Sequence, residues 1–188
     1  ARKASGQANH SLADWIAPAT NGTDYLGAFS VTIQGIEPHL QRFEAAHDDY
    51  HKIMLQALAD RLAEAFAEAL HHRVRTDLWG YAPGEALSTE DLIAEKYRGI
   101  RPAPGYPACP DHSVKQDMFR LLQAGEIEMG LTESLAMTPA ASVSGFYLSH
   151  PDSTYFNVGR VGDDQLQDLA RRRGVRAEDL QRLLAPNL

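Results

Sequence analysis

The sequence predicts an α+β fold: a single domain with a long amphipathic helix, several shorter helices and a small, mainly antiparallel sheet. Three observations favour this class. Apolar side chains recur at three- and four-residue intervals over residues 37–76, short β-rich segments lie on both sides of that region, and helical and strand-like segments do not alternate as βαβ units do. The 188 residues, 44% of them hydrophobic, are enough to bury one core, so one domain is expected.

The start of the chain, residues 1–23, is predicted to be an irregular lead-in to a domain that spans residues 24–188. It is polar and contains proline, asparagine and glycine, which favour turns. Because ARKASGQANH resembles a linker or a cut end, we expect the natural chain to extend upstream. The domain opens with DYLGAFSVTIQ, in which the alternation of Phe29, Val31 and Ile33 predicts a strand.

Residues 37–76 are predicted to form one long amphipathic helix, because no glycine or proline follows Pro38. The apolar positions are Leu40, Phe43, Tyr50, Ile53, Met54, Leu58, Leu62, Phe66, Leu70 and Val74. The opposite face is charged, with Glu44, Asp48, Lys52, Arg61, Glu64 and Glu68. This helix is the expected spine of the fold.

The next region is predicted to contain a loop, a short helix and a stiff linker. The loop covers residues 80–87, and Ser88 with Asp91 has the spacing of a helix N-terminal cap, so a helix is expected to end near Gly99. Residues 101–111, RPAPGYPACPD, contain four prolines and are expected to be extended and unable to enter a sheet interior.

The last third of the chain is predicted to contain a helix, a hairpin and a helical pair. Ser113 and Gln116 resemble a capping box, and the turn sequence at residues 150–153 favours a hairpin. Gly174 separates the final two helices. The expected elements are a helix from Ser113 to Gly125, strands at residues 143–148 and 155–158, and helices at residues 163–173 and 177–184.

Composition excludes several classes of function. A net charge of -7 and a pI near 5.6 argue against a nucleic-acid partner. The single cysteine, Cys109, excludes an intramolecular disulfide and a thiolate zinc cluster, and no apolar run approaches the roughly 20 residues of a membrane span, so a cytoplasmic protein is expected. Neither GxGxxG nor GxxxxGK[ST] occurs, which argues against dinucleotide and nucleoside-triphosphate sites.

The proline-rich segment is the strongest candidate for a ligand site. Its prolines hold the cation of Arg101, the aromatic ring of Tyr106 and several carbonyl groups in a stiff frame, so little ordering entropy is lost on binding. Arg101 can bind a carboxylate through two hydrogen bonds. The alternative is a structural crossover in which Arg101 pairs with an internal acid.

Two weaker candidates carry structural alternatives. His47 and His51, four residues apart, suggest a metal site with Asp48, but the metalloprotease glutamate is missing and no third ligand is evident, so a partly exposed helix face is the stronger interpretation. Cys109 and His112 suggest a nucleophile and base, against which a packed, inert cysteine is the stronger interpretation because no helix N-terminus lowers the thiol pKa. We therefore predict neither a catalytic residue nor a bound metal.

The segment EKYRGIRPAPGYPACPDH (Glu95 to His112) resembles the activation domain of vitamin B12-dependent methionine synthases. The resemblance covers essentially the whole chain. It extends to SLADWIAP, DYLGAFSVT, FEAAHDDYHKIMLQALADRLAEAFAE, WGYAPGE, LTESLAMTPAASVSGFYLSHPDSTYF and the C-terminal LAPNL.

The resemblance implies a role in methionine biosynthesis, in an enzyme that transfers a methyl group from methyltetrahydrofolate to homocysteine through cobalamin. The domain would present S-adenosylmethionine for reductive remethylation of cob(II)alamin, and this fragment alone would not be a complete catalyst. Cobalamin would be carried by the neighbouring module, and flavodoxin or a related flavoprotein would supply the electron. The implied ligand residues are Arg101, Pro104, Gly105, Tyr106, Tyr155, Phe156 and Glu95.

Two further implications concern docking and completeness. Asp60 and Glu64, one turn apart, would face the cobalamin module or the reductase. The family's domain is longer at its N-terminal end, where an aspartate also contacts the ligand, and Asp14 belongs to SLADWIAP and is not that residue. The alternatives are a docking-only module that binds a corrinoid protein or a reductase without the ligand, and a small metal-dependent hydrolase using the histidine cluster.

Overall fold

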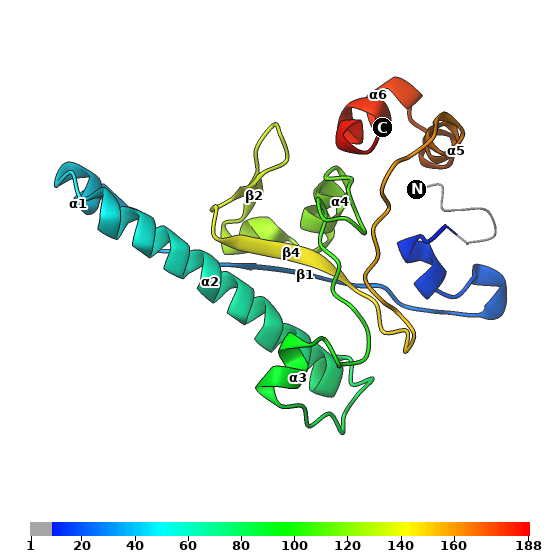
Figure 1. Cartoon of the computed structure of the whole chain (residues 1–188), viewed down its shortest axis with the longest axis horizontal. Coiled ribbons are helices and arrows are strands. Elements are labelled where there is room, and N and C mark those ends of the chain that lie inside the picture. Colours follow the sequence, from blue (N-terminus) through cyan, green and yellow to red (C-terminus); the bar gives the residue numbers. More distant parts are fainter. Residues whose placement is uncertain (1–8) are drawn as a thin grey trace. The chain divides into compact units, whose positions relative to one another are not determined.

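The computed structural model describes residues 9–188 (Figure 1). These residues divide into two compact units. Each unit combines segments that are distant in sequence. Among the described residues, the first unit contains residues 9–27, Arg98–Val114 and Phe146–Leu188, and the second contains Ala28–Tyr97 and Lys115–Gly145. Within residues 9–188, no helix combines the length and the apolar character that a bilayer span requires.

The second unit holds the longest helix and both small sheets. Its helices are α1 (Glu37–Ala45), α2 (Asp49–Arg73), the π-helical turn η3 (Val74–Leu78), α3 (Thr89–Ile93), most of α4 (Val114–Leu121) and the 3-10 turn η4 (Ala124–Ile127). In the first sheet, β1 (Gly27–Thr32) pairs with β4 (Ser142–Tyr147); Gly27, Phe146 and Tyr147, at the ends of these strands, belong to the first unit. In the second sheet, β2 (Gly130–Leu131) pairs antiparallel with β3 (Met137–Thr138). The predicted strand at β1 is confirmed, and its alternating Phe29 and Val31 are buried.

The long predicted helix is broken once. His47 has φ 53, in the left-handed region, and the new helix α2 begins after Asp48, whose side chain accepts a hydrogen bond from the His51 N–H. An Asp side chain at this position satisfies an N–H that the first helical turn leaves unpaired. The prediction of one uninterrupted helix over residues 37–76 is therefore wrong at this point.

Three rows of side chains, each with a four-residue spacing, define three faces of α2. The buried row is Ala59, Ala63, Ala67 and His71. The row one residue earlier is large, apolar and exposed: Tyr50, Met54, Leu58, Leu62 and Phe66. The row one residue after the buried one carries the acids Asp60, Glu64 and Glu68. Because consecutive residues differ by about 100° around a helix, the apolar row and the acidic row lie on nearly opposite sides.

The first unit consists of a helical pair and irregular segments. α5 (Asp163–Arg173) and α6 (Ala177–Leu183) follow the predicted ranges closely, and Gly174 ends α5 with φ 66. They bury a small core made of Leu166, Ala170, Leu180 and Leu184. Near the start of the chain lie two 3-10 turns, η1 (Leu12–Trp15) and η2 (Ala19–Asn21), and near its end a third, η5 (Ala185–Asn187).

The predicted hairpin between residues 143–148 and 155–158 does not form. The first of these segments becomes β4 and pairs with β1, while the second has no strand structure. The N–H of Val158 instead donates to the carbonyl of Pro107 at 2.9 Å. The backbone after the turn therefore joins the proline-rich segment of the first unit.

Candidate functional site

The proline-rich segment is held along its length by hydrogen bonds within the first unit. Ile100 forms an antiparallel bridge with Leu148, and the carbonyl of Pro102 accepts from the N–H of Phe146 at 2.9 Å. Further along, the N–H of Gly105 donates to the carbonyl of Cys109 at 2.7 Å. The segment is thus fixed by its prolines and by backbone bonds at several points.

Two predicted ligand residues meet at the start of this segment. The backbone N–H of Arg101 donates to the hydroxyl oxygen of Tyr155 at 3.0 Å, across 54 positions of sequence. Tyr155 is exposed and Phe156 is half-buried, with its ring 5.7 Å from that of His10. Tyr106 exposes 61% of its surface, so its ring remains accessible to a ligand.

A tight turn at Gly105 shapes the middle of the segment. Gly105 has φ 97, and a Cβ placed on it would lie 2.2 Å from Cε1 of His112. The imidazole of His112 therefore occupies the space that any other residue at position 105 would need. His112, which the sequence suggested only as a possible base, lies against the turn that carries Tyr106.

Gly105→Ala tests this turn and is expected to lower the free energy of unfolding by about 1–3 kcal/mol, since alanine is strained at positive φ and its methyl displaces the His112 ring. Urea unfolding followed by circular dichroism measures the change. Gly84→Ala is the matched control, because nothing lies within 4 Å of a Cβ there. Equal stability of the two variants would contradict this account of the turn.

The end of the segment is anchored by α5. The guanidinium of Arg173 makes an ion pair with the buried carboxylate of Asp111, and its Nη2 donates to the Ser113 hydroxyl at 3.1 Å. Asp111 also accepts a hydrogen bond from the N–H of Ser113 at 2.7 Å. Basic residues in the last turn of a helix, here Arg171, Arg172 and Arg173, favour its C-terminus. Their second role links residues 62 positions apart and has no local signal.

Cys109 has the properties of a packed cysteine. Burial, with a smaller contribution from the charge of Asp111, raises the pKa of its thiol to about 11. A thiol with that pKa is almost entirely protonated near neutral pH, and the thiolate is the nucleophilic form. The nucleophile hypothesis for Cys109 and His112 therefore gains no support from the site.

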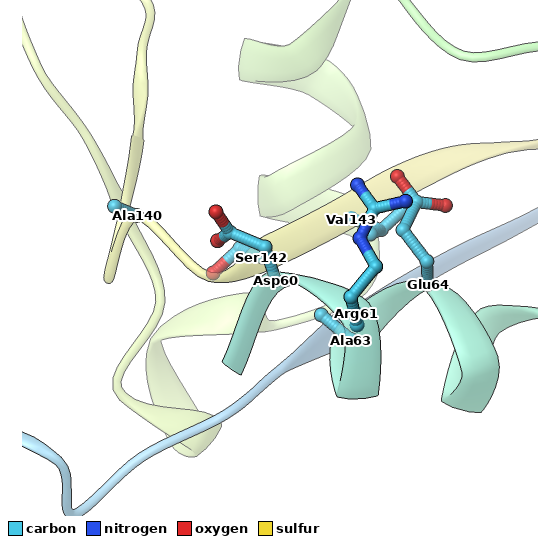
Figure 2. Close-up of a pocket in the computed structure, with 7 residues that line it drawn as sticks. All are labelled: Asp60, Arg61, Ala63, Glu64, Ala140, Ser142 and Val143. Atoms are coloured by element: carbon cyan, nitrogen blue, oxygen red, sulfur yellow. The ribbon is translucent and has the colours of Figure 1, made fainter. Parts of the chain in front are cut away.

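The second unit places Asp60 and Glu64 in one pocket of about 290 Å³ (Figure 2). Their side chains come from α2, and the facing wall is formed by residues at the start of β4 and just before it. The lining residues are Asp60, Arg61, Ala63, Glu64, Ala140, Ser142 and Val143. The pocket presents two carboxylates and one hydroxyl beside the guanidinium of Arg61, and the carboxylates suit a partner that donates hydrogen bonds.

Glu95 and the histidine cluster are placed differently from what the sequence suggested. Glu95 is exposed at φ 54 in the second unit, whereas the other predicted ligand residues belong to the first. His47 precedes α2, so it does not share a helical face with His51, and the His51 ring is hydrogen-bonded to Asp48 at 2.7 Å. Among residues 9–188, no group of three metal-ligating side chains is found.

A buried polar cluster in the second unit was not predicted. Arg75, in the π-helical turn, donates to both carboxylate oxygens of Glu85 at 2.7 and 2.6 Å, and its Cζ lies 4.2 Å from the ring centre of Tyr97. The ring of His71 meets Tyr97 edge-on at 5.0 Å. Glu85 belongs to the WGYAPGE motif. A buried carboxylate requires a cationic partner, but the sequence did not show that this partner is Arg75. π-Helical turns occur often at functional positions.

Two comparisons with known proteins bear on the site. The family model described as "Vitamin B12 dependent methionine synthase, activation domain" matches residues 1–174. A crystal structure of the MetH reactivation domain bound to AdoHcy is similar to this chain, with a TM-score of 0.93 and 57% sequence identity. The match covers 99% of this chain and 58% of that chain, so this chain spans less than two thirds of the solved relative. The predicted α+β class is confirmed.

Proposed function

The chain belongs to the family of activation domains of vitamin B12-dependent methionine synthases, and on that premise we propose that it binds S-adenosylmethionine and presents it as the methyl donor for reductive remethylation of cob(II)alamin. The observation that carries the proposal is the junction of Arg101 with Tyr155 in the stiff proline-rich segment. The solved relative was crystallised with AdoHcy, the demethylated form of this donor.

The residues of the first unit fit such a ligand chemically. Arg101 offers five N–H donors in a planar fork that suits the amino-acid carboxylate. The exposed ring of Tyr106 offers an apolar face, and Pro104, a buried residue of the turn itself, stiffens the backbone. Tyr155 and Phe156 complete the proposed set, to which Glu95 is added from the family motif.

The proposed chemistry requires positioning more than acid–base groups. A sulfonium methyl group is already activated for transfer to a strong nucleophile, so the protein contributes orientation and exclusion of water. This agrees with a segment whose geometry is set by prolines, by the His112 ring against Gly105 and by the Arg173–Asp111 pair. In this proposal the chain is one part of a methyltransferase and not a complete catalyst.

Titration of the chain with AdoHcy and with S-adenosylmethionine by calorimetry tests the function. Saturable binding of both, with one site per chain, is expected. The solved relative is the positive control, because its crystal structure contains AdoHcy. Binding by the relative and none by this chain would contradict binding by this chain alone, and it would mean that the site also needs residues of the relative that this chain does not match.

We further propose that the cobalamin-carrying module, and flavodoxin or a related flavoprotein, dock on the acidic pocket of α2. Asp60 and Glu64 are exposed there, and their carboxylates can accept hydrogen bonds from a histidine or another donor of the partner.

Asp60→Asn is expected to weaken docking of the family's cobalamin-binding module by about tenfold while leaving S-adenosylmethionine affinity unchanged, because a charge-assisted hydrogen bond becomes a neutral one. Fluorescence anisotropy of the labelled module measures docking, and calorimetry measures the ligand. Asp49→Asn, in the first turn of α2 and outside the pocket, is the control with the same change of charge. Loss of ligand binding in Asp60→Asn would refute the docking role.

A further inference from the structure

Two segments of the first unit that are far apart in sequence contact each other around two proposed ligand residues, Tyr155 and Phe156. One is the N-terminal segment, defined here as residues 10–25, and the other is the Tyr155 loop, residues 149–158. The sequence predicted an irregular lead-in at the first of these and gave it no part in the ligand site. Its ring contacts with the Tyr155 loop give it such a part.

The N-terminal segment is shaped by its own hydrogen bonds. Ser11 and Asp14 form a capping box, in which the Asp14 carboxylate accepts from the N–H of Ser11 at 2.8 Å. The box sets the turn η1, so Trp15 at the end of that turn has a defined direction. Near the end of the segment, the Asp24 carboxylate accepts from the N–H of Ala17 at 2.8 Å.

Two ring contacts join the N-terminal segment to the Tyr155 loop. The indole of Trp15 lies against the imidazole of His150, with 5.5 Å between the ring centres. The imidazole of His10 lies against the ring of Phe156, with 5.7 Å between the centres. Both separations are in the range of favourable aromatic pairs, about 4.5–7 Å. One contact precedes Tyr155 in sequence and the other follows it.

His150 connects the Trp15 contact to the turn that leads into Tyr155. The carbonyl of His150 accepts from the N–H of Ser153 at 3.1 Å and from its hydroxyl at 2.7 Å, and Ser153 is buried. The imidazole Nδ1 of His150 accepts from the N–H of Asp152 at 3.2 Å. Movement of His150 would therefore disturb the turn that precedes Tyr155.

The Tyr155 loop is also attached to the proline-rich segment. The hydroxyl oxygen of Tyr155 accepts from the N–H of Arg101 at 3.0 Å, and the N–H of Val158 donates to the carbonyl of Pro107 at 2.9 Å. The loop is thus held by two sets of contacts, rings of the N-terminal segment and hydrogen bonds of the proline-rich segment. The amide protons of Arg101 and Val158 report whether the second set is formed.

We propose that Trp15 and His10 are positioning residues for the S-adenosylmethionine site. They hold the Tyr155 loop in the conformation in which Tyr155 meets Arg101, and they act through the loop without touching the ligand. The role in ligand binding rests on the function proposed above, whereas the hold on Tyr155 does not.

The test compares Trp15→Ala with Trp15→Phe in the whole chain. Within residues 9–188 the buried indole N–H of Trp15 donates to no other group, so the contact consists of ring packing and phenylalanine should restore it. NMR measures the hydrogen exchange of the Arg101 and Val158 amides, and calorimetry measures the affinity for AdoHcy. Trp15→Ala is expected to accelerate both exchange rates and to weaken binding by about tenfold, because an aromatic pair is lost. Trp15→Phe is expected to restore all three values.

Two further variants complete the set. Trp79→Ala is the matched control, because Trp79 is also half-buried and meets one ring, that of Tyr81 at 5.3 Å, but belongs to the second unit. It should leave the exchange of the Arg101 and Val158 amides unchanged. His10→Ala tests the second ring contact at an exposed position that the fold tolerates, so it decides the question even if Trp15→Ala does not fold. It should change exchange and binding in the same direction as Trp15→Ala.

Three results would overturn the proposal. If Trp15→Ala and His10→Ala exchange and bind like Trp79→Ala, the N-terminal segment does not hold the loop. If exchange accelerates and affinity stays unchanged, the loop does not position the ligand residues. If Trp15→Phe behaves like Trp15→Ala, ring packing is not the cause. If the unaltered chain binds neither AdoHcy nor S-adenosylmethionine, the proposed function fails for this chain alone, and the exchange rates still decide whether Trp15 holds Tyr155 against Arg101.

Discussion

Replacing Arg101 by alanine is expected to lower the affinity for S-adenosylmethionine and AdoHcy by about a hundredfold or more, because truncating one partner of a hydrogen-bonded charge pair costs about 2–5 kcal/mol. Arg101 begins the stiff segment, and its backbone is fixed to Tyr155, so its side chain starts from a defined position. The side chain is half-buried and the hydrogen bond to Tyr155 uses the backbone, so the fold should tolerate the change. Calorimetric titration measures the affinity.

A second variant separates the contribution of the guanidinium fork from that of charge, and a third serves as the control. Arg101→Lys keeps the charge and loses the planar pair of donors, so an intermediate affinity is expected. Arg171→Ala removes an exposed arginine of the same unit that pairs with Asp168, and it should bind like the unaltered chain. If Arg101→Ala binds as tightly as Arg171→Ala, Arg101 does not contact the ligand.

Arg75→Ala is expected to destabilise the chain by about 3–5 kcal/mol, since removing one partner of a buried ion pair leaves the other charge uncompensated. The Arg75 side chain is fully buried and that of Glu85 is 5% exposed. The variant also removes the cation from the face of Tyr97. Urea unfolding at neutral pH measures the loss, and a chain that no longer folds at all agrees with the upper end of this range.

Arg73 provides the matched control, two residues earlier in the same helical run. It pairs with Asp77 at 3.5 Å, and both side chains are about two-thirds exposed, at 66% and 67%. Exposed pairs contribute about 0–1 kcal/mol, so Arg73→Ala should change stability little. If the two variants lose similar amounts of unfolding free energy, burial does not make the Arg75–Glu85 pair more important for stability than the exposed pair.

The local elements could be predicted from the sequence wherever one short-range signal dominates. Gly174 between two helical patterns gave α5 and α6 nearly to the residue, and alternation at Phe29 and Val31 gave β1. The break at His47 was missed because no glycine or proline marks it, although Asp48, which caps α2, is of a residue type that favours helix N-termini. Strand partners were missed for a different reason: the pairing of β1 with β4 joins distant segments, whereas the turn at residues 150–153 suggested a local hairpin.

The candidate site could be predicted in part. The family resemblance of the proline-rich segment implied Arg101 and Tyr106 as ligand residues, which stays a prediction, and the stiffness of that segment follows from its prolines alone. The supports of the segment could not be foreseen, since the contacts of Arg173 with Asp111 and of Tyr155 with Arg101 connect residues far apart in sequence. Periodicity likewise located the apolar row of α2 without showing that the alanine row is the one this chain buries.

The interleaving of the two units determines the order in which a ribosome can complete them. The second unit has all its residues once Gly145 has emerged, whereas the first still lacks everything from Phe146 onward. At about 5–20 residues per second, the nascent proline-rich segment waits several seconds for Tyr155 and Arg173. The helix with the acidic pocket can therefore mature early during translation, and the contacts of the proline-rich segment are completed last. A chain that stopped soon after Tyr147 would contain the whole of β4 but neither Tyr155 nor Arg173, the two residues that contact the proline-rich segment.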